Sequence, residues 1–336
     1  CAVITALGMD HTDVLGKTLA EIAFEKAGIL KAGSRMVLLD PAAAADAEEA
    51  AAARAVVEGR CAALGIPFRL VSQSQVRLLS TGLSGLGTGR PGQRFRVDLS
   101  GLGLPGFDDP VFETGFLAPY QPLNLACALA ACRVVAQVLD LDEASCREGI
   151  RRVRWPGRFE LLRQNPPMIL DGGHNPQGAR QLGLGLSRLL PDAGWHLVVG
   201  ILADKDVDGM LGALADTLEG RIRSIRCTTP DSPRALSADA LADRFRRFAI
   251  DTPSGYNNTA VASTFDPGVP ASARPGFSCR VLAIPKPEAA VLDALAEAAS
   301  EGGAVCAFGS LYLAGRIRTA LHASGPSNGL RDPGAP

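Results

Sequence analysis

Apolar residues recur along this chain with two different spacings, and the change falls near residue 165. Downstream of it, short apolar runs alternate with helical patterns, which is typical of a parallel sheet wrapped by helices. The apolar runs predicted as strands are MILD, WHLVVGI, IRSIRCTT, VLAIP and AVCAFG. The predicted helices lie near 177–190, 207–219, 237–248, 287–300 and 311–322. The second part of the chain is therefore expected to be an α/β domain.

The first part of the chain follows a mixed pattern. We expect a strand at 1–9, helices at 18–27, 41–64 and 122–139, and a further strand at 66–72. Residues 76–112 are rich in glycine and in β-forming residues and suggest hairpins. The polar, proline-bearing stretch RRVRWPGRFELLRQNPP links the two parts, so we expect domains at 1–160 and 161–322.

Two segments interrupt the globular pattern of the second part. Residues 249–279 are rich in Ser, Thr, Pro and Gly, which predicts a loop insertion within the second domain. The tail 323–336, with the sequence SGPSNGLRDPGAP at its end, is predicted to be disordered. The sequence gives no role for residues 249–279.

Two stretches match the pattern G-x-G-x-x-G, namely GTGRPG at 87–92 and GLGLPG at 101–106. A dinucleotide-binding loop must open a helix, because the helix N-terminus receives the pyrophosphate. The first stretch leads into the strand-like QRFRVDL and the second into FDDPVF. Both are therefore predicted to be hairpin turns.

Composition narrows the class of protein. The 336 residues suffice for about two domains, and 34 basic against 35 acidic residues leave a net charge of −1. This balance gives no sign of a nucleic-acid partner or of a membrane surface. The 8 cysteines include no C-x-x-C pair, and no apolar run is long enough to span a membrane. We therefore expect reduced thiols and a cytoplasmic location.

Candidate chemistry begins at GMDHTDVLGKTLAEIAFEKAGILK. Thr18 and Glu21 form a capping box that marks the start of a helix. At helical spacing Lys26 falls within the apolar stripe at 19, 22, 23, 27 and 30, so burial is expected to disfavour its charged form. A neutral amine can add CO₂ to give a carbamate that ligates Mg²⁺. Alternatively, the lysine snorkels to the surface, and His11 in the preceding turn bonds locally.

A second group of polar residues lies in PGRFELL and in MILDGGHNPQGARQLGLGL. The strand MIL ends at Asp171, and Asn175 is placed to cap the next helix. Such a strand end beside a helix N-terminus is where α/β sheets bind phosphorylated ligands, and the Arg158 guanidinium suits phosphate oxygens. Taken singly, Arg158 could form a surface ion pair, Asp171 could cap a helix and His174 could bond to backbone carbonyls.

Taken together, these motifs resemble those of a known family. LGMDHTDVLGKTLAEIAFEKAGILK is similar to the central signature of the folylpolyglutamate synthase/dihydrofolate synthase family, within the Mur ligase superfamily. PGRFE followed by DGGHNP is similar to the start of its C-terminal domain, and the likeness runs from about residue 3 to 322, outside 249–279. The resemblance implies an α/β fold: the end of a P-loop-type Mur ligase central domain, followed by a Rossmann-like C-terminal α/β domain.

The resemblance also implies a metal site and a catalytic group. His11 would bind Mg²⁺, and Lys26 would be carbamylated beside the metal, serving as both a metal ligand and a catalytic residue. His174 would lie near the phosphates or the incoming glutamate, as the second catalytic residue.

A nucleotide site is implied in the same way. Arg158 and Asp171 would contact ATP, and Asn124 in YQPLNLACALAA matches the start of a helix that touches the nucleotide. Asn124 could instead be an ordinary polar residue in a first helical turn. Lys205 in GILADKD and Ser310 in FGSLYLAGRIR are further candidates, for the glutamate pocket.

The family joins L-glutamate to a folate carboxylate through an acyl phosphate formed from ATP. The implied cofactors are therefore ATP and Mg²⁺, and the implied substrates are glutamate and either tetrahydrofolate or dihydropteroate. This chemistry belongs to folate biosynthesis, polyglutamylation and one-carbon metabolism. A cytoplasmic monomer, without a nucleic-acid or membrane partner, is expected.

One required motif is missing from the chain. No G-x-x-x-x-G-K-[ST] loop occurs, although this loop cradles the triphosphate. Because the chain opens with Cys1 inside a strand-like run, we expect that loop and an upstream metal-binding glutamate to precede it, and we expect no ligase activity from this chain alone. Two alternatives stay open: a non-catalytic nucleotide-binding fragment or scaffold, and a cell-wall Mur ligase.

Overall fold

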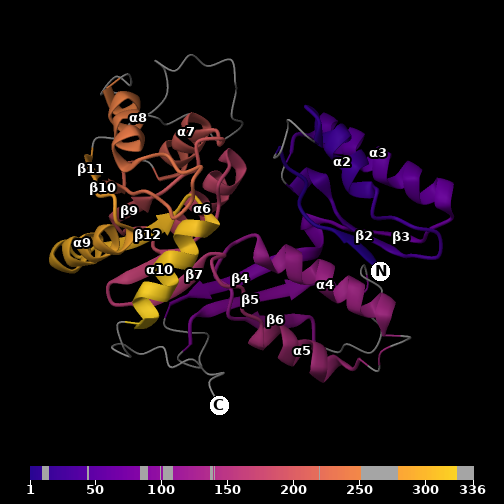
Figure 1. The fold of residues 1–336 in the computed structure, drawn as a ribbon. Coiled ribbons are helices and arrows are strands. Elements are labelled where there is room, and N and C mark those ends of the chain that lie inside the picture. The colour runs from indigo at the N-terminus through magenta and orange to yellow at the C-terminus, as the bar shows by residue number, and fades with distance from the viewer. Residues whose placement is uncertain are drawn as a thin grey trace. The chain divides into compact units, whose positions relative to one another are not determined.

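The computed structural model divides the chain into two compact units, Cys1–Arg154 and Trp155–Pro336, which are described separately. Most elements of each are labelled in Figure 1. The described residues are 1–9, 15–43, 45–83, 90–98, 100, 109–136, 139, 141–218, 220–250 and 279–323. The predictions for His11, for the glycine motif at 101–106, for 249–279 and for the tail fall wholly or mostly outside these ranges, and so does half of the glycine motif at 87–92.

The first unit contains a parallel three-stranded sheet in the order β1-β2-β3. Its strands are Ala2–Ile4, Met36–Leu39 and Phe68–Val71. Helices α2 (Leu19–Ala27) and α3 (Ala47–Leu64) pack on one face, where Leu38 joins their apolar residues. Val37 belongs to the opposite face, because successive strand residues alternate. The sheet is buried on both sides, which explains why every residue of β2 is apolar.

Helix α4 (Gln121–Val135) and a second, antiparallel sheet in the order β4-β5-β6 contribute to the core on that opposite face. The antiparallel strands are Val76–Gly82, Gly92–Val97 and Val111–Thr114. Phe95 and Phe112 stack between neighbouring strands, with ring centroids 5.8 Å apart. Helix α5 (Glu143–Arg152) packs against β6. The expected hairpin region is thus confirmed as an antiparallel sheet.

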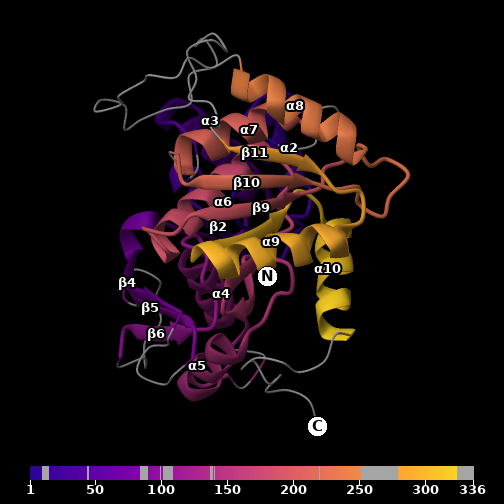
Figure 2. The same cartoon turned by 90° about the vertical axis from the view of Figure 1, so that its left-hand side faces the viewer.

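The second unit is built on a six-stranded sheet in the order β11-β10-β9-β12-β8-β7. From β7 to β12 the strands are Glu160–Gln164, Pro167–Leu170, Trp195–Val199, Ile222–Cys227, Arg280–Ala283 and Ala304–Phe308. All neighbours are parallel except β7 and β8. From α6 to α10 the helices are Pro176–Leu189, Val207–Leu218, Ala238–Ile250, Pro287–Glu301 and Leu311–Ala323. Helices α9 and α10 cover one face, and α6, α7 and α8 cover the other (Figure 2).

The order of the strands creates a switch point between β8 and β12. Strand β8 is followed by α6 on one face, and its neighbour β12 is followed by α10 on the other. Open α/β sheets bind ligands outside the carboxyl ends of their strands at such a point. Asp171 comes directly after β8, and its N–H donates to the Ala307 carbonyl of β12 at 2.9 Å. The fold therefore places the loop DGGHNP at the switch point.

Some of the predicted elements differ from the structure. Only Ala2–Ile4 of the strand expected at 1–9 is extended. The helix expected from residue 41 begins at Ala47, because Pro41–Ala43 form a separate 3-10 turn and Asp46 caps the helix. The sequence pattern also failed to predict β2, β7 and α5. The sequence of α5, EASCREGIRR, is mostly polar and buries only Ile150, so its apolar signal is weak.

Two observations concern membranes and thiols. Among the described residues no helix combines the length and the apolar character needed to cross a membrane. All 8 cysteines lie within the described ranges, and none forms a disulfide. Burial raises the pKa of Cys127 and of Cys227 to about 12 in each case. These two thiols therefore serve as small apolar core groups.

Candidate nucleotide site in the second unit

Asp171 lies at the carboxyl end of β8 with only 5% of its surface exposed. One carboxylate oxygen accepts a hydrogen bond of 2.8 Å from the Phe159 N–H, and the other accepts one of 2.7 Å from the Gly173 N–H. Burial raises the pKa of this carboxyl, although both N–H groups and the charges of Arg158 and His174 oppose the rise. Asp171 therefore ties the turn that carries Arg158 to the loop that carries His174.

The turn before β7 presents Arg158 between two residues with positive φ. Gly157 has a φ of 69°, and Phe159 has a φ of 50°, which is uncommon for a large side chain. The buried Phe159 ring anchors the turn, and Glu160 accepts a hydrogen bond of 2.8 Å from the Gly157 N–H. Arg158 itself is half-buried. The turn is fixed on both sides of Arg158, whose charge acts on the Asp171 carboxyl and opposes the rise of its pKa.

The loop after β8 leads directly into the N-terminus of α6. Asn175 caps this helix by accepting a hydrogen bond of 2.7 Å from the Gly178 N–H, as its place in the sequence predicted. His174 Nδ1 lies 3.0 Å from the Gly172 carbonyl oxygen. The first N–H groups of a helix carry partial positive charge and favour anions such as phosphate. Together with Arg158 they give the switch point a cationic edge.

Two further loops begin at the same edge of the sheet, after β9 and β12. Ser310 follows β12 and is only 2% exposed, and its Oγ accepts a hydrogen bond of 3.1 Å from the Leu313 N–H. Lys205 lies beyond the end of β9, with its Nζ 3.5 Å from the Asp204 carboxylate. Strands β8, β12 and β9 are neighbours, so both loops share this edge with Asp171. The glutamate pocket predicted at Ser310 and Lys205 stays a prediction.

Lys26 in the first unit differs from its sequence-based prediction. Helix α2 begins with the expected capping box, in which the Glu21 N–H donates to Thr18 Oγ1 at 3.2 Å. Ile22 and Ala27 of the apolar stripe are buried, but Lys26 is exposed. The expectation of a buried amine is therefore wrong. Lys26 lies in the last turn of the short helix α2, where a long side chain can leave the stripe and keep its charge in water.

The other roles expected in the first unit stay predictions. His11 lies outside the described residues. Asn124 lies in the first turn of α4, half-buried, and its Nδ2 donates to Gln121 Oε1 at 3.1 Å. This contact within the helix satisfies one amide hydrogen and leaves the nucleotide role of Asn124 as a prediction. The carbamate on Lys26 now depends on the family motif alone, because burial no longer argues for it.

Glu160 belongs to the candidate site and was not predicted. One of its oxygens accepts the Gly157 N–H, and the other accepts a hydrogen bond of 3.1 Å from Arg318 Nε on α10. Glu160 therefore fixes the residue before Arg158, whereas Asp171 fixes the residue after it. A signal was present in the sequence, since a carboxylate directly after a glycine-containing turn can accept the backbone N–H groups of that turn.

Comparison with known proteins places this geometry in a family. The model of the Mur ligase glutamate ligase domain matches residues 157–311. Dihydrofolate synthase/folylpolyglutamate synthase of Bacillus subtilis is 28% identical over 243 residues, which cover 72% of this chain and 51% of that protein. The Mycobacterium tuberculosis protein of the same name is 30% identical over 300 residues, which cover 80% of this chain and 54% of that protein.

The fold agrees with these matches. Crystal structures of Mycobacterium tuberculosis folylpolyglutamate synthase complexed with ADP and AMPPCP superpose with a TM-score of 0.65 at 25% identity. The superposition covers 95% of this chain and 63% of that one. This chain spans about half the length of the curated relatives that it matches.

The sheet order, the site at its switch point and these likenesses define the class of protein: the chain belongs to the Mur ligase superfamily. Within that superfamily it belongs to the folylpolyglutamate synthase/dihydrofolate synthase family. The resemblance drawn from its motifs is thereby confirmed, and so is the expected Rossmann-like α/β domain.

Proposed function

We propose that this chain is part of an ATP-dependent ligase that adds L-glutamate to a folate, as a folylpolyglutamate synthase, a dihydrofolate synthase or both. One observation carries the proposal: Arg158 and the N-terminus of α6 form a cationic edge beside Asp171, within a glutamate ligase domain. The relatives named for these two activities support it. They belong to the folate branch, which disfavours the cell-wall alternative.

ATP bound with Mg²⁺ would supply the phosphoryl group that activates the folate carboxylate. The residues of this chain contribute charge and position. Arg158 offers a planar guanidinium whose paired N–H donors match phosphate oxygens, and the first N–H groups of α6 favour the same charge. Donors that are already in place when charge develops stabilise the transition state of phosphoryl transfer.

Asp171 and Glu160 act in this proposal as positioning residues. Each accepts a backbone N–H beside Arg158, so the turn does not need to rearrange when a ligand arrives. His174 can take part in proton transfer. Because the Gly172 carbonyl can only accept, a neutral His174 keeps its proton on Nδ1 and leaves Nε2 as the basic nitrogen. This nitrogen is suited to accept a proton from the ammonium group of the incoming glutamate.

The first unit would hold the metal in this proposal. A carbamate on Lys26 offers oxygen ligands, which Mg²⁺ prefers, and the exposed amine is open to CO₂. His11 would be a second ligand, and Asn124 would contact the nucleotide. We further propose that the protein works as a monomer in the cytoplasm.

The test is ATP-dependent incorporation of labelled glutamate into tetrahydrofolate and, separately, into dihydropteroate, with the natural full-length protein that contains this chain. Arg158→Met should lower ligation about 100-fold, because a preorganised donor to the reacting phosphate is lost. Arg188→Met is the matched control, since Arg188 is an exposed residue of α6 in the same domain. Absence of incorporation into either folate, or incorporation into a UDP-sugar peptide instead, would overturn the proposal.

A further inference from the structure

The antiparallel sheet of the first unit carries two arginines that have no partner in the part of the chain that the structure describes. Arg77 of β4 and Arg96 of β5 lie directly opposite each other in the strand register. Both side chains are exposed, and within the described residues neither forms a hydrogen bond or an ion pair. Like charges at directly opposite positions destabilise a strand pair. This arrangement is unfavourable for the sheet unless an anion neutralises the pair.

A neighbouring arginine of the same sheet is paired. Arg94, two residues before Arg96 on the same strand and face, has its Nε 3.3 Å from the Glu113 carboxylate of β6. The register places Arg96 opposite Val111 on that side and opposite Arg77 on the other. Among the described residues, therefore, no acidic residue is directly opposite Arg96.

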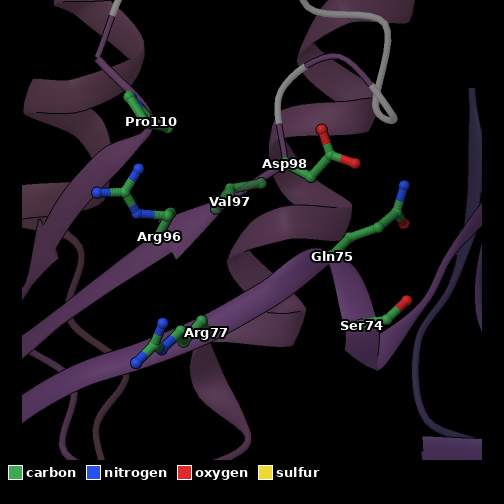
Figure 3. A pocket seen from close by; sticks show the side chains of 7 residues that line it. All are labelled: Ser74, Gln75, Arg77, Arg96, Val97, Asp98 and Pro110. Atoms are coloured by element: carbon green, nitrogen blue, oxygen red, sulfur yellow. The ribbon is translucent and has the colours of Figure 1, made fainter.

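The two arginines line an open cavity of about 410 Å³, shown in Figure 3. In that view their side chains rise from neighbouring strands, while Asp98 and Gln75 lie toward the end of β5. Among the described lining residues Asp98 is the only acidic one, and its carboxylate accepts a hydrogen bond of 2.7 Å from the Ser100 hydroxyl. The other lining residues are Ser74, Val97 and Pro110. The described lining thus carries two positive charges and one negative charge, a balance that favours an anion.

We propose that Arg77 and Arg96 bind two carboxylates of a single ligand, a γ-linked oligoglutamate chain. The proposal rests on the proposed function, because a glutamate-adding ligase meets such chains as its product and as its next substrate. Every residue of a γ-linked chain keeps a free α-carboxylate, so carboxylates recur at short intervals along it. Side chains opposite each other on antiparallel strands start about 4.5–5.5 Å apart, and each guanidinium can hold one carboxylate through two N–H donors.

Calorimetric titration of the purified full chain with γ-linked tetraglutamate, at low salt, tests this site. Wild type should bind. R77Q and R96Q should each weaken binding about fivefold, and the double variant should lose it, since two exposed contacts act together. R60Q is the matched control, because Arg60 is an exposed arginine of α3 without a partner among the described residues. All these positions are exposed, and circular dichroism verifies that each variant is folded.

Three results would overturn the site: no binding by wild type, wild-type affinity in the double variant, or tighter binding of α-linked tetraglutamate. The last result would assign the arginines to an acidic protein segment instead. The outcome is independent of the ligase assay. Binding through Arg77 and Arg96 without ligation would refute the proposed function alone, and ligation without this binding would refute the site alone.

Discussion

The Asp171 carboxylate and the Phe159 N–H, 12 residues apart in the sequence, are joined by a hydrogen bond of 2.8 Å. This bond connects the turn before β7 with the loop after β8, and it helps to hold Phe159 at a positive φ beside Arg158. The acidic residue at the switch point is almost fully buried, and both of its oxygens are already bonded to the backbone. These bonds favour a role for Asp171 in holding the backbone of the site in place. Direct contact of Asp171 with ATP stays a prediction.

Replacing Asp171 with Ala should therefore destabilise the second unit by about 2 kcal/mol. The N–H groups of Phe159 and Gly173 lose their acceptors in a buried place, and relief from burying a carboxylate offsets only part of that cost. Urea unfolding of the purified chain measures the change. Asp192→Ala, at an exposed position of the same unit, is the control and should stay within about 0.5 kcal/mol of wild type. Equal stability of the Asp171 variant would mean that both N–H groups find other partners.

Replacing Lys26 with Ala should distinguish a role in metal binding from a role in stability. Because Lys26 is exposed on α2 and Ala is the better helix former, stability should change by less than about 0.5 kcal/mol. Ligation by the full-length enzyme should nevertheless fall about 100-fold, since a metal ligand worth several kcal/mol is lost. Labelling with ¹³C-bicarbonate should give a carbamate signal in wild type and none in the variant. Lys31→Ala, also exposed, should keep both activity and signal, and normal turnover without Lys26 would exclude the carbamate.

Much of the second unit could be predicted because its central strands are unbroken apolar runs. Ala304–Phe308 is buried at every position, so its sequence alone marks a strand covered on both faces. The loop of the candidate site could be predicted in the same way, since DGGHNP comes directly after such a run and its proline begins the next helix. Short elements of mixed composition, such as Glu143–Arg152, gave no comparable signal.

The residues that hold the site in shape were harder to predict. Glu160 bonds to Arg318, 158 residues away, and no local pattern contains a contact of that range. The prediction that Lys26 is buried was wrong for a related reason. Helical spacing shows on which side of a helix a residue lies. Only the folded structure shows how far along that side neighbouring elements pack against the helix and bury it. Sequence reasoning therefore located the candidate site and missed the contacts that hold it in place.

Gly157→Ala tests whether the turn before β7 positions Arg158. A Cβ at residue 157 would meet only Ala314 Cβ, at an ordinary 3.5 Å, so the cost of about 1–2 kcal/mol comes from its φ of 69°. Gly65, which ends α3 with a φ of 61° and open space around a new Cβ, is the matched control for the same strain. Both variants should lose similar stability, and only Gly157→Ala should weaken ADP binding by the full-length protein. Equal ADP affinities in the two variants would remove the turn from the site.

A buried ionic network ties α9 to the sheet of the second unit. Glu297 of α9 accepts hydrogen bonds from Arg226, which is 1% exposed, and from the Ser224 hydroxyl of β10 at 2.8 Å. Burial alone would raise the pKa of Glu297, but the hydrogen bonds from Arg226 and Ser224 outweigh it and lower that pKa to about 2. His196 of β9 lies with Nδ1 3.2 Å from the same carboxylate, and burial lowers its pKa. Both shifts make the folded state bind fewer protons than the unfolded one.

Acid should consequently destabilise the second unit in two stages. Below pH 6.5 the unfolded state takes up a proton on His196 before the folded state does, so stability begins to fall. The contribution of Glu297 is complete above pH 4.5 and is lost as the pH falls toward about 2, a change of the order of 3 kcal/mol. Glu297→Gln should lower stability at neutral pH, because the buried Arg226 loses its charged partner, and should flatten the profile below pH 4.5.

Urea unfolding between pH 7 and pH 2.5 measures both stages of this acid effect. Glu148→Gln is the control. Its hydrogen bond with Arg151 also lowers the pKa of Glu148 to about 2, but that pair is exposed on α5, where solvent and salt screen it. At about 0.2 M salt the Glu148 variant should follow the wild-type profile. A Glu297 variant with the wild-type slope below pH 4.5 would show that the network does not govern the acid sensitivity of this unit.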